Sequence, residues 1–281
     1  MKYAVSIYSF MQYVWAGKMN PVDCIVKAKE MGFDGIEIVD CIFGNENDIE
    51  LAKELRAKAD DVGIEIPNLA VGGELLVEGT VEKFKHFVDV AEILGTSYMR
   101  HDAGGDWMLE KYESYDSALG RLADSCREIT EYAVAKGIKT MTENHGQFSQ
   151  DSLRIEKLVS AVAHKNFGHL LDIGNFMCAD EDPAVAVSRC GKYAFFVHAK
   201  DFIVKDGNGV SPGDGFFMSR GGNFLRGTII GHGDVPVVRC LRSLKSHGYD
   251  GWMSVEFEGM EDCIEAIRIG YSNLKRFWES V

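Results

Sequence analysis

The chain has 281 residues, of which 46% are hydrophobic and 26% are charged, as is ordinary for a soluble globular protein. This length suits one large α/β domain or two small ones. The formal net charge of −13 argues against a nucleic-acid-binding protein, because that affinity comes mainly from neutralised phosphates. The N-terminal run lacks a signal-peptide pattern, and no apolar stretch approaches membrane-spanning length. Together with seven scattered cysteines, these features predict a cytoplasmic protein that binds neither nucleic acid nor membrane.

Short apolar runs alternate with longer amphipathic segments along the chain. The expected strands are 3–8, 35–40, 64–71, 97–101, 138–143, 168–172, 194–200 and 252–257. The expected helices are 21–31, 47–62, 80–94, 112–136, 152–164, 183–190, 234–246 and 261–278. Asn20 followed by Pro21 is typical of a helix start, and Gly95 follows the third expected helix as a stop signal.

About eight strand–helix units predict a (β/α)8 TIM barrel formed by one domain, residues 1–281. A doubly wound sheet is the competing interpretation. That fold would be expected to have a glycine-rich phosphate-binding loop after the first strand, and residues 9–12 contain no glycine. Residues 103–110 and a long Gly-rich loop between strands seven and eight, 202–235, exceed what a barrel needs. Loops of this length are usually lids or binding loops.

Four consecutive expected strands end in an ionisable residue: Glu143, Asp172, His198 and Glu256. Each one alone is more often a helix cap, an ion-pair partner or a satisfied histidine. Because strand ends converge at one mouth of a barrel, the four together predict a shared metal site. Three oxygen ligands and one imidazole suit Mn²⁺, Mg²⁺, Co²⁺ or Fe²⁺ with open positions for a substrate. Without a cation, the three carboxylates would repel one another.

Other polar residues near these strand ends are candidates for contact with a substrate. His145 lies two positions after Glu143, so its side chain is expected on the same side, where it would suit a general base. The alternative is that His145 only orients Asn144 or the neighbouring loop. Lys200 shares a face with His198 and would stabilise an enolate or bind an anion, or else it pairs with Glu258 or Asp201. His101 ends the fourth strand, and Trp107 would stack on a sugar or simply pack.

Several motifs together resemble the xylose isomerase-like barrel superfamily of sugar-phosphate isomerases and epimerases. They are GFDGIEIVD (32–40), TENHG (142–146), LLDIGNF (170–176), FVHAKD (196–201), GHGDVP (231–236) and GYDGWMSVEFEG (248–259). The resemblance implies that Glu143, Asp172, His198 and Glu256 bind one divalent metal, Mn²⁺ by preference, with Mg²⁺, Co²⁺, Fe²⁺ or Zn²⁺ as alternatives. It also implies a small-molecule carbohydrate substrate.

The family's ketose 3-epimerases use the two glutamates as an acid/base pair, which implies these roles for Glu143 and Glu256. We expect catalytic help from His145 and Lys200. We expect substrate contacts from His101, Asn175, Glu258 and Trp107. Two departures stand out: Asn175 takes the place of a substrate-binding histidine, and the loop 202–235 is longer than usual, with Arg220 and Arg226 in it.

The function expected first is metal-dependent isomerisation or epimerisation of a sugar, sugar phosphate or keto-sugar, by proton abstraction next to a carbonyl through a metal-stabilised enediolate. The TENHG motif also resembles the branch that includes the catalytic subunits of C-glycoside deglycosidases. The first alternative is therefore a metal-dependent lyase that acts on a 3-oxo sugar, similar either to those enzymes or to inosose dehydratase. The second is a non-catalytic barrel subunit, in which Glu143→Gln would change nothing. The final helix and Trp278 would suit a homo-oligomer. The DNA-repair endonucleases of this fold need extra histidines, where this chain has Asn68 and Asn175.

Overall fold

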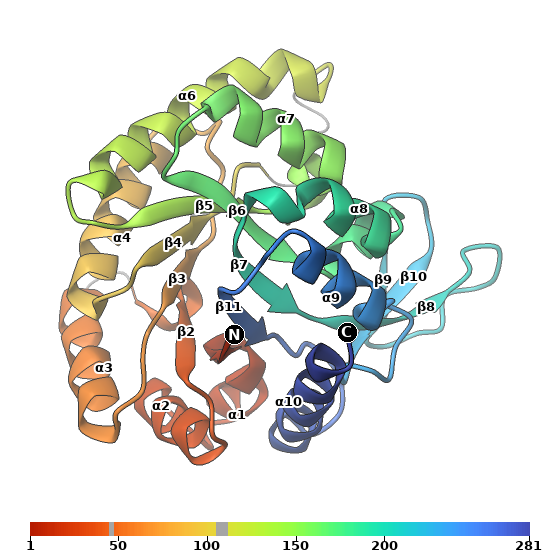
Figure 1. The fold of residues 1–281 in the computed structure, drawn as a ribbon, viewed down its shortest axis with the longest axis horizontal. Helices are drawn as coiled ribbons and strands as arrows, with labels where there is room; N and C mark the ends of the chain where they lie inside the picture. Colours follow the sequence, from red (N-terminus) through yellow and green to blue (C-terminus); the bar gives the residue numbers. More distant parts are fainter. Residues whose placement is uncertain (45–47, 105–111) are drawn as a thin grey trace.

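The computed structural model of the protein describes residues 1–44, 48–104 and 112–281. Within these residues, parallel strands close into a barrel in the order β1-β11-β7-β6-β5-β4-β3-β2 (Figure 1). They are β1 (Lys2–Ser6), β2 (Gly35–Val39), β3 (Asn68–Val71), β4 (Tyr98–His101), β5 (Lys139–Glu143), β6 (Phe167–Asp172), β7 (Ala194–Ala199) and β11 (Trp252–Val255). The barrel closes because β1 pairs with both β2 and β11. The predicted TIM barrel is confirmed.

Helices surround the barrel on its outside (Figure 1). Their bounds are α1 (Met11–Trp15), α2 (Pro21–Glu30), α3 (Asp48–Val62), α4 (Thr80–Leu94), α6 (Tyr115–Val134), α7 (Ser152–Val162), α8 (Pro183–Cys190), α9 (Val237–Ser246) and α10 (Cys263–Glu279). The start of α2 follows the predicted signal, because the Asn20 side chain accepts a hydrogen bond from the Asp23 amide at 2.9 Å. Among the described helices, none is long and apolar enough to cross a membrane.

The interior of the barrel holds an apolar layer beneath its carboxyl end. The buried residues that pack in this layer are Ala4, Met141, Leu170, Phe196 and Trp252. Met141, Leu170 and Phe196 each precede an ionisable strand-end residue by two positions, and positions two apart share a face of a strand. The apolar layer therefore supports a layer of ionisable side chains directly above it.

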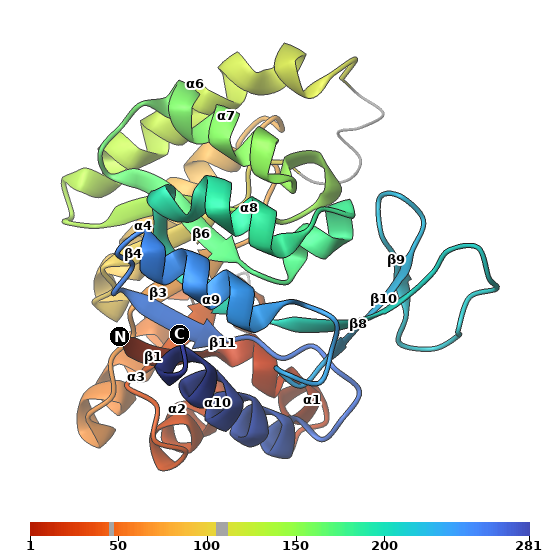
Figure 2. The same ribbon diagram turned by 45° about the vertical axis from the view of Figure 1, so that its right-hand side comes forward.

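The segment between β7 and β11 contains a small antiparallel sheet. Its strands are β8 (Asp201–Lys205), β10 (Phe224–Thr228) and β9 (Phe217–Met218), in that spatial order. Figure 2 shows this sheet projecting from one side of the barrel. The sequence analysis predicts a loop over 202–235 because many glycines separate two short runs, FIVK and FLRGT, that have the composition of strands.

Asp201 anchors this sheet to the barrel. Its carboxylate accepts hydrogen bonds from the backbone amides of Gly231 at 2.7 Å, Gly233 at 3.0 Å and Val235 at 3.1 Å. A Cβ atom at Gly233 would lie 2.3 Å from the Asp201 carboxylate, so only glycine permits this approach. The GHGDVP motif is thus a backbone cradle for one buried carboxylate.

Candidate active site

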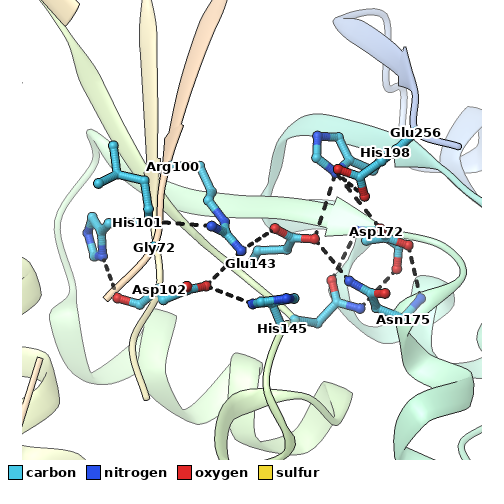
Figure 3. Close-up of polar contacts among 12 residues, drawn as sticks. Gly72, Arg100, His101, Asp102, Glu143, His145, Asp172, Asn175, His198 and Glu256 are labelled. Carbon is cyan, nitrogen blue, oxygen red and sulfur yellow. Dashed lines mark hydrogen bonds and ion pairs between the residues drawn. The ribbon is translucent and has the colours of Figure 1, made fainter. Parts of the chain in front are cut away.

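Four strand ends deliver their ionisable side chains to one point at the mouth of the barrel. Glu143, Asp172 and His198 lie on β5, β6 and β7, and Glu256 directly follows β11. All four are buried, and one ligand atom from each lies within 4.8 Å of the others (Figure 3). These residues form a group that could hold a metal ion.

His198 is oriented toward the other three by Glu37 on β2. The His198 Nε2 atom lies 2.7 and 2.9 Å from the two carboxylate oxygens of Glu37. The Nδ1 atom therefore faces the cluster, 3.3 Å from Glu256, 3.7 Å from Glu143 and 3.8 Å from Asp172. Burial lowers the pKa of His198, but the charges of Glu37 and Glu256 outweigh burial and hold this pKa well above its usual value.

Glu37 is fully buried and is held by two further donors. The Asn68 side-chain amide donates to it at 2.6 Å, and the Ser254 hydroxyl donates at 3.1 Å. A carboxylate behind a ligating histidine fixes which ring nitrogen faces a metal. The sequence alone predicts no role for Glu37. The sequence does contain one indication of its role, because Glu37 is the single carboxylate in the buried strand GIEIV. An unpaired charge there would strongly destabilise the folded state, so a buried partner is expected.

Asp172 is fixed by the start of the following turn. Its Oδ1 atom accepts hydrogen bonds from the amides of Gly174 at 2.7 Å and Asn175 at 2.9 Å. The Asn144 side chain donates to the Asp172 carbonyl and accepts from the Asp172 amide, both at 2.9 Å, so it joins the ends of β5 and β6. Burial raises the pKa of Asp172 to about 6, although Lys200 opposes this shift.

Arg100, rather than His101, points from β4 into the site. Its guanidinium lies 2.6 Å from Glu143 and 2.7 Å from Asp102. Burial raises the pKa of Glu143, but Arg100 and His198 outweigh burial and hold it well below its usual value. The His101 ring is fully buried between Phe84 and Phe167, with ring centroids 5.2 and 5.9 Å away. We correct the predicted substrate contact accordingly, because neighbouring residues of a strand face opposite sides.

Lys200 lies within the cluster and is surrounded by carboxylates. Its Nζ atom is 2.6 Å from Glu256, 3.3 Å from Asp172 and 3.3 Å from Glu258. Burial disfavours the ammonium form, but these carboxylates outweigh it and hold the pKa of Lys200 well above its usual value. The positive charge of Lys200 is thus compensated by carboxylates. Asp201, which the sequence offered as a possible partner of Lys200, instead accepts hydrogen bonds from backbone amides.

His145 stands at the entrance of the site, with half of its side chain exposed. Its Nδ1 atom lies 3.1 Å from Asp102, so the rest of the ring faces the mouth of the barrel (Figure 3). Burial lowers the pKa of His145, but Asp102 outweighs it and raises this pKa to about 9. A largely protonated ring suits a proton donor better than the general base expected from the sequence.

The remaining predicted substrate-binding residues lie in three different situations. Asn175 donates from its amide to Glu143 at 3.0 Å and accepts from Lys200 at 3.3 Å. Glu258 borders the mouth and is about one-third exposed. Trp107 lies outside the described residues, so its expected sugar contact stays a prediction.

Two adjoining cavities open at this mouth. The inner cavity, bordered by Glu143, His198 and Glu256, has a volume of about 250 Å³. The side cavity, bordered by Gln150, Phe202, Phe217 and Met218, has a volume of about 310 Å³. His145, Lys200 and Glu258 border both of them.

The cluster fits a divalent cation on two observations. The buried Nδ1 atom of His198 makes no hydrogen bond to any described residue, although three carboxylates surround it. Three carboxylates and one imidazole are also the donors that Mn²⁺, Mg²⁺, Fe²⁺ and Zn²⁺ take in sites with open positions. A cation at this point would neutralise charges that otherwise repel.

Comparisons with known proteins agree with the barrel fold. Inosose dehydratase of Clostridium perfringens (strain 13 / Type A) is 25% identical over 260 residues, which cover 86% of this chain and 84% of that protein. The zinc-bound structure of IOLI protein superposes with a TM-score of 0.79 at 18% identity, covering 100% of this chain and 99% of that one. L-ribulose 3-epimerase superposes with a TM-score of 0.72 at 14% identity, covering 99% and 95%. The model of the xylose isomerase-like TIM barrel family matches residues 25–276, so this chain belongs to that family.

Proposed function

We propose that the protein is a divalent-metal-dependent enzyme that isomerises or epimerises a sugar or keto-sugar. It would act by removing a proton from the carbon next to a carbonyl. The observation that carries the proposal is the cluster of Glu143, Asp172, His198 and Glu256 at the floor of a cavity. A cation bound there, Mn²⁺ by preference, would polarise the substrate's carbonyl and make the neighbouring proton more acidic.

The proposed roles of the two glutamates follow from their neighbours. Glu143 is ionised at neutral pH and borders the inner cavity, so it can accept a proton from a substrate bound there. Glu256 lies 2.6 Å from Lys200, whose ammonium group favours the ionised form of this carboxylate as well. Two carboxylates in one cavity allow a proton to leave from one face of a carbon and return on the other, which is the chemistry of an epimerase.

A second candidate is elimination from the same intermediate. It is favoured by His145, which is held by Asp102, borders both cavities and would give a proton to a departing hydroxyl group. The 25% identity to an inosose dehydratase supports this alternative at the level of the family. The two candidates share the first step and differ in whether a leaving group departs.

Solvent exchange tests the shared step. The metal-loaded protein is incubated in D₂O with a panel of keto-sugars and keto-inositols, and products are followed by NMR and mass spectrometry. We expect deuterium at the carbon next to the carbonyl, with Glu143→Gln slower by at least about a hundredfold and Glu65→Gln, on the exposed surface, unchanged. A product isomeric with its substrate supports the isomerase, and a product lighter by one water supports the lyase. Turnover without deuterium at that carbon would rule out both.

A further inference from the structure

None of the four proposed metal ligands borders the side cavity. It adjoins the inner cavity through His145, Lys200 and Glu258, yet its volume of about 310 Å³ exceeds the 250 Å³ of the inner one. A substrate confined to a single sugar ring above the cluster would leave this second space unfilled. The walls of the side cavity therefore indicate what else the substrate carries.

One wall of the side cavity is apolar and open. Phe217 and Met218, on β9, are 43% and 59% exposed, although large apolar side chains are stabilised by burial. Phe202 is buried behind them, with its ring 5.7 Å from that of Phe217 in an edge-to-face arrangement. An apolar group lying on this wall would cover surface that the fold leaves in water.

The lining of the side cavity also includes the amide of Gln150. The Gln150 side chain is only 3% exposed and borders the side cavity. No other described residue forms a hydrogen bond with its side chain, so the amide is open to a molecule bound in the cavity. A hydroxyl, ether or carbonyl oxygen on the bound molecule would satisfy this amide.

The charges of the two cavities exclude an anionic group. Among the described residues, the bordering cations are Arg100, His145, His198 and Lys200, and each of them is paired with at least one carboxylate. Asp40, Asp102 and Glu258 add further negative charge around the inner cavity. A phosphate needs free Arg or Lys donors, which this part of the chain does not offer.

We infer that the side cavity is a second substrate subsite for an uncharged, partly apolar substituent attached to the sugar or cyclitol. The inference deepens the proposed function and rests on it for the role of the inner cavity. The substituent lies with its apolar face on Phe217 and Met218 and directs an oxygen to Gln150. A phosphorylated sugar is rejected.

Fragment binding followed by NMR tests this subsite without knowing the sugar. Metal-loaded protein with ¹³C-labelled methionine methyl groups is titrated with benzyl alcohol and with benzyl phosphate. The Met218 signal is assigned with Met218→Leu. We expect a saturable shift of that signal with benzyl alcohol only. Gln150→Ala and Phe217→Ala should each weaken binding about fivefold, the equivalent of one hydrogen bond or a partial apolar contact.

The controls separate this inference from the proposed function. Val210→Ala, 93% exposed on the same segment, should leave the titration unchanged. Asp172→Asn, which removes a proposed metal ligand, should also leave benzyl alcohol binding intact. No saturable shift at Met218, or equal binding of benzyl phosphate, would overturn the subsite while leaving the metal site standing.

Discussion

At the scale of single residues, the site depends on how His198 is held. Its Nε2 atom is occupied by Glu37, and Glu37 is in turn bound by Asn68 and Ser254. This chain of buried contacts leaves only Nδ1 to face the three carboxylates. A ligand fixed in this way loses little conformational freedom when it binds a cation.

Glu37→Gln should weaken metal binding because the amide keeps the shape of the carboxylate and loses its charge. We expect a Kd for Mn²⁺ that is about 10- to 100-fold higher, measured by isothermal titration calorimetry. Glu65→Gln is the matched control, since Glu65 is exposed and pairs with Lys2. Equal affinity of Glu37→Gln and wild type would show that His198 needs no support from Glu37.

Arg100→Met should destabilise the metal-free protein. Arg100 is buried and compensates both Glu143 and Asp102, so its removal takes the guanidinium charge away from two carboxylates at once. We expect the free energy of unfolding to fall by about 3 kcal/mol in chemical denaturation. Arg268→Met removes an exposed pair with Glu265 and should change it by less than about 0.5 kcal/mol. Equal effects of the two substitutions would contradict the buried role of Arg100.

The sequence could predict the residues that end strands, but not those that support them. Glu143, Asp172, His198 and Glu256 follow apolar runs in a regular order, so their meeting point followed from barrel geometry. Glu37 lies in the middle of a strand, and its partner His198 is 161 residues away, so no local pattern connects them. In β4, four residues are too few to decide from sequence whether Arg100 or His101 faces inward.

At the scale of elements, the small sheet β8–β10–β9 forms the outer wall of the side cavity. Its two longer strands pair over five residues, and its base is fixed by Asp201. The sequence predicted the neighbouring helix α8 closely, at residues 183–190 as expected. It missed this sheet because strands of two to five residues separated by glycines give no periodic signal.

Asp201→Ala should loosen this sheet without disrupting the barrel. The substitution leaves the amides of Gly231, Gly233 and Val235 without their acceptor. Each buried donor that stays unpaired destabilises the folded state by about 1–3 kcal/mol. We expect faster hydrogen exchange across 201–235, with β5 and β6 still protected. Asp206→Ala is the control, because Asp206 bonds only the exposed amide of Asn208. Uniformly faster exchange across the chain would mean that Asp201 supports the whole fold.

At the scale of the whole molecule, the barrel brings together carboxylates that oppose one another when no cation is present. A ligand that binds only the folded state stabilises it by mass action. Adding Mn²⁺ at about a thousandfold excess over its Kd should therefore raise the free energy of unfolding by about 4 kcal/mol, and EDTA should reverse the gain. Glu143→Gln should respond much less in thermal denaturation. A melting temperature that changes with neither Mn²⁺ nor EDTA would argue against a metal at this site.

The measurement that tests the central claim most directly is metal stoichiometry. Wild type, Asp172→Asn and the surface control Asp206→Asn are loaded with Mn²⁺, passed through gel filtration and analysed by mass spectrometry of the elements. The account predicts about one ion per chain in wild type and in Asp206→Asn, and a loss of most of it in Asp172→Asn. Wild type holding less than about 0.2 ion per chain, or Asp172→Asn holding as much as wild type, would contradict it.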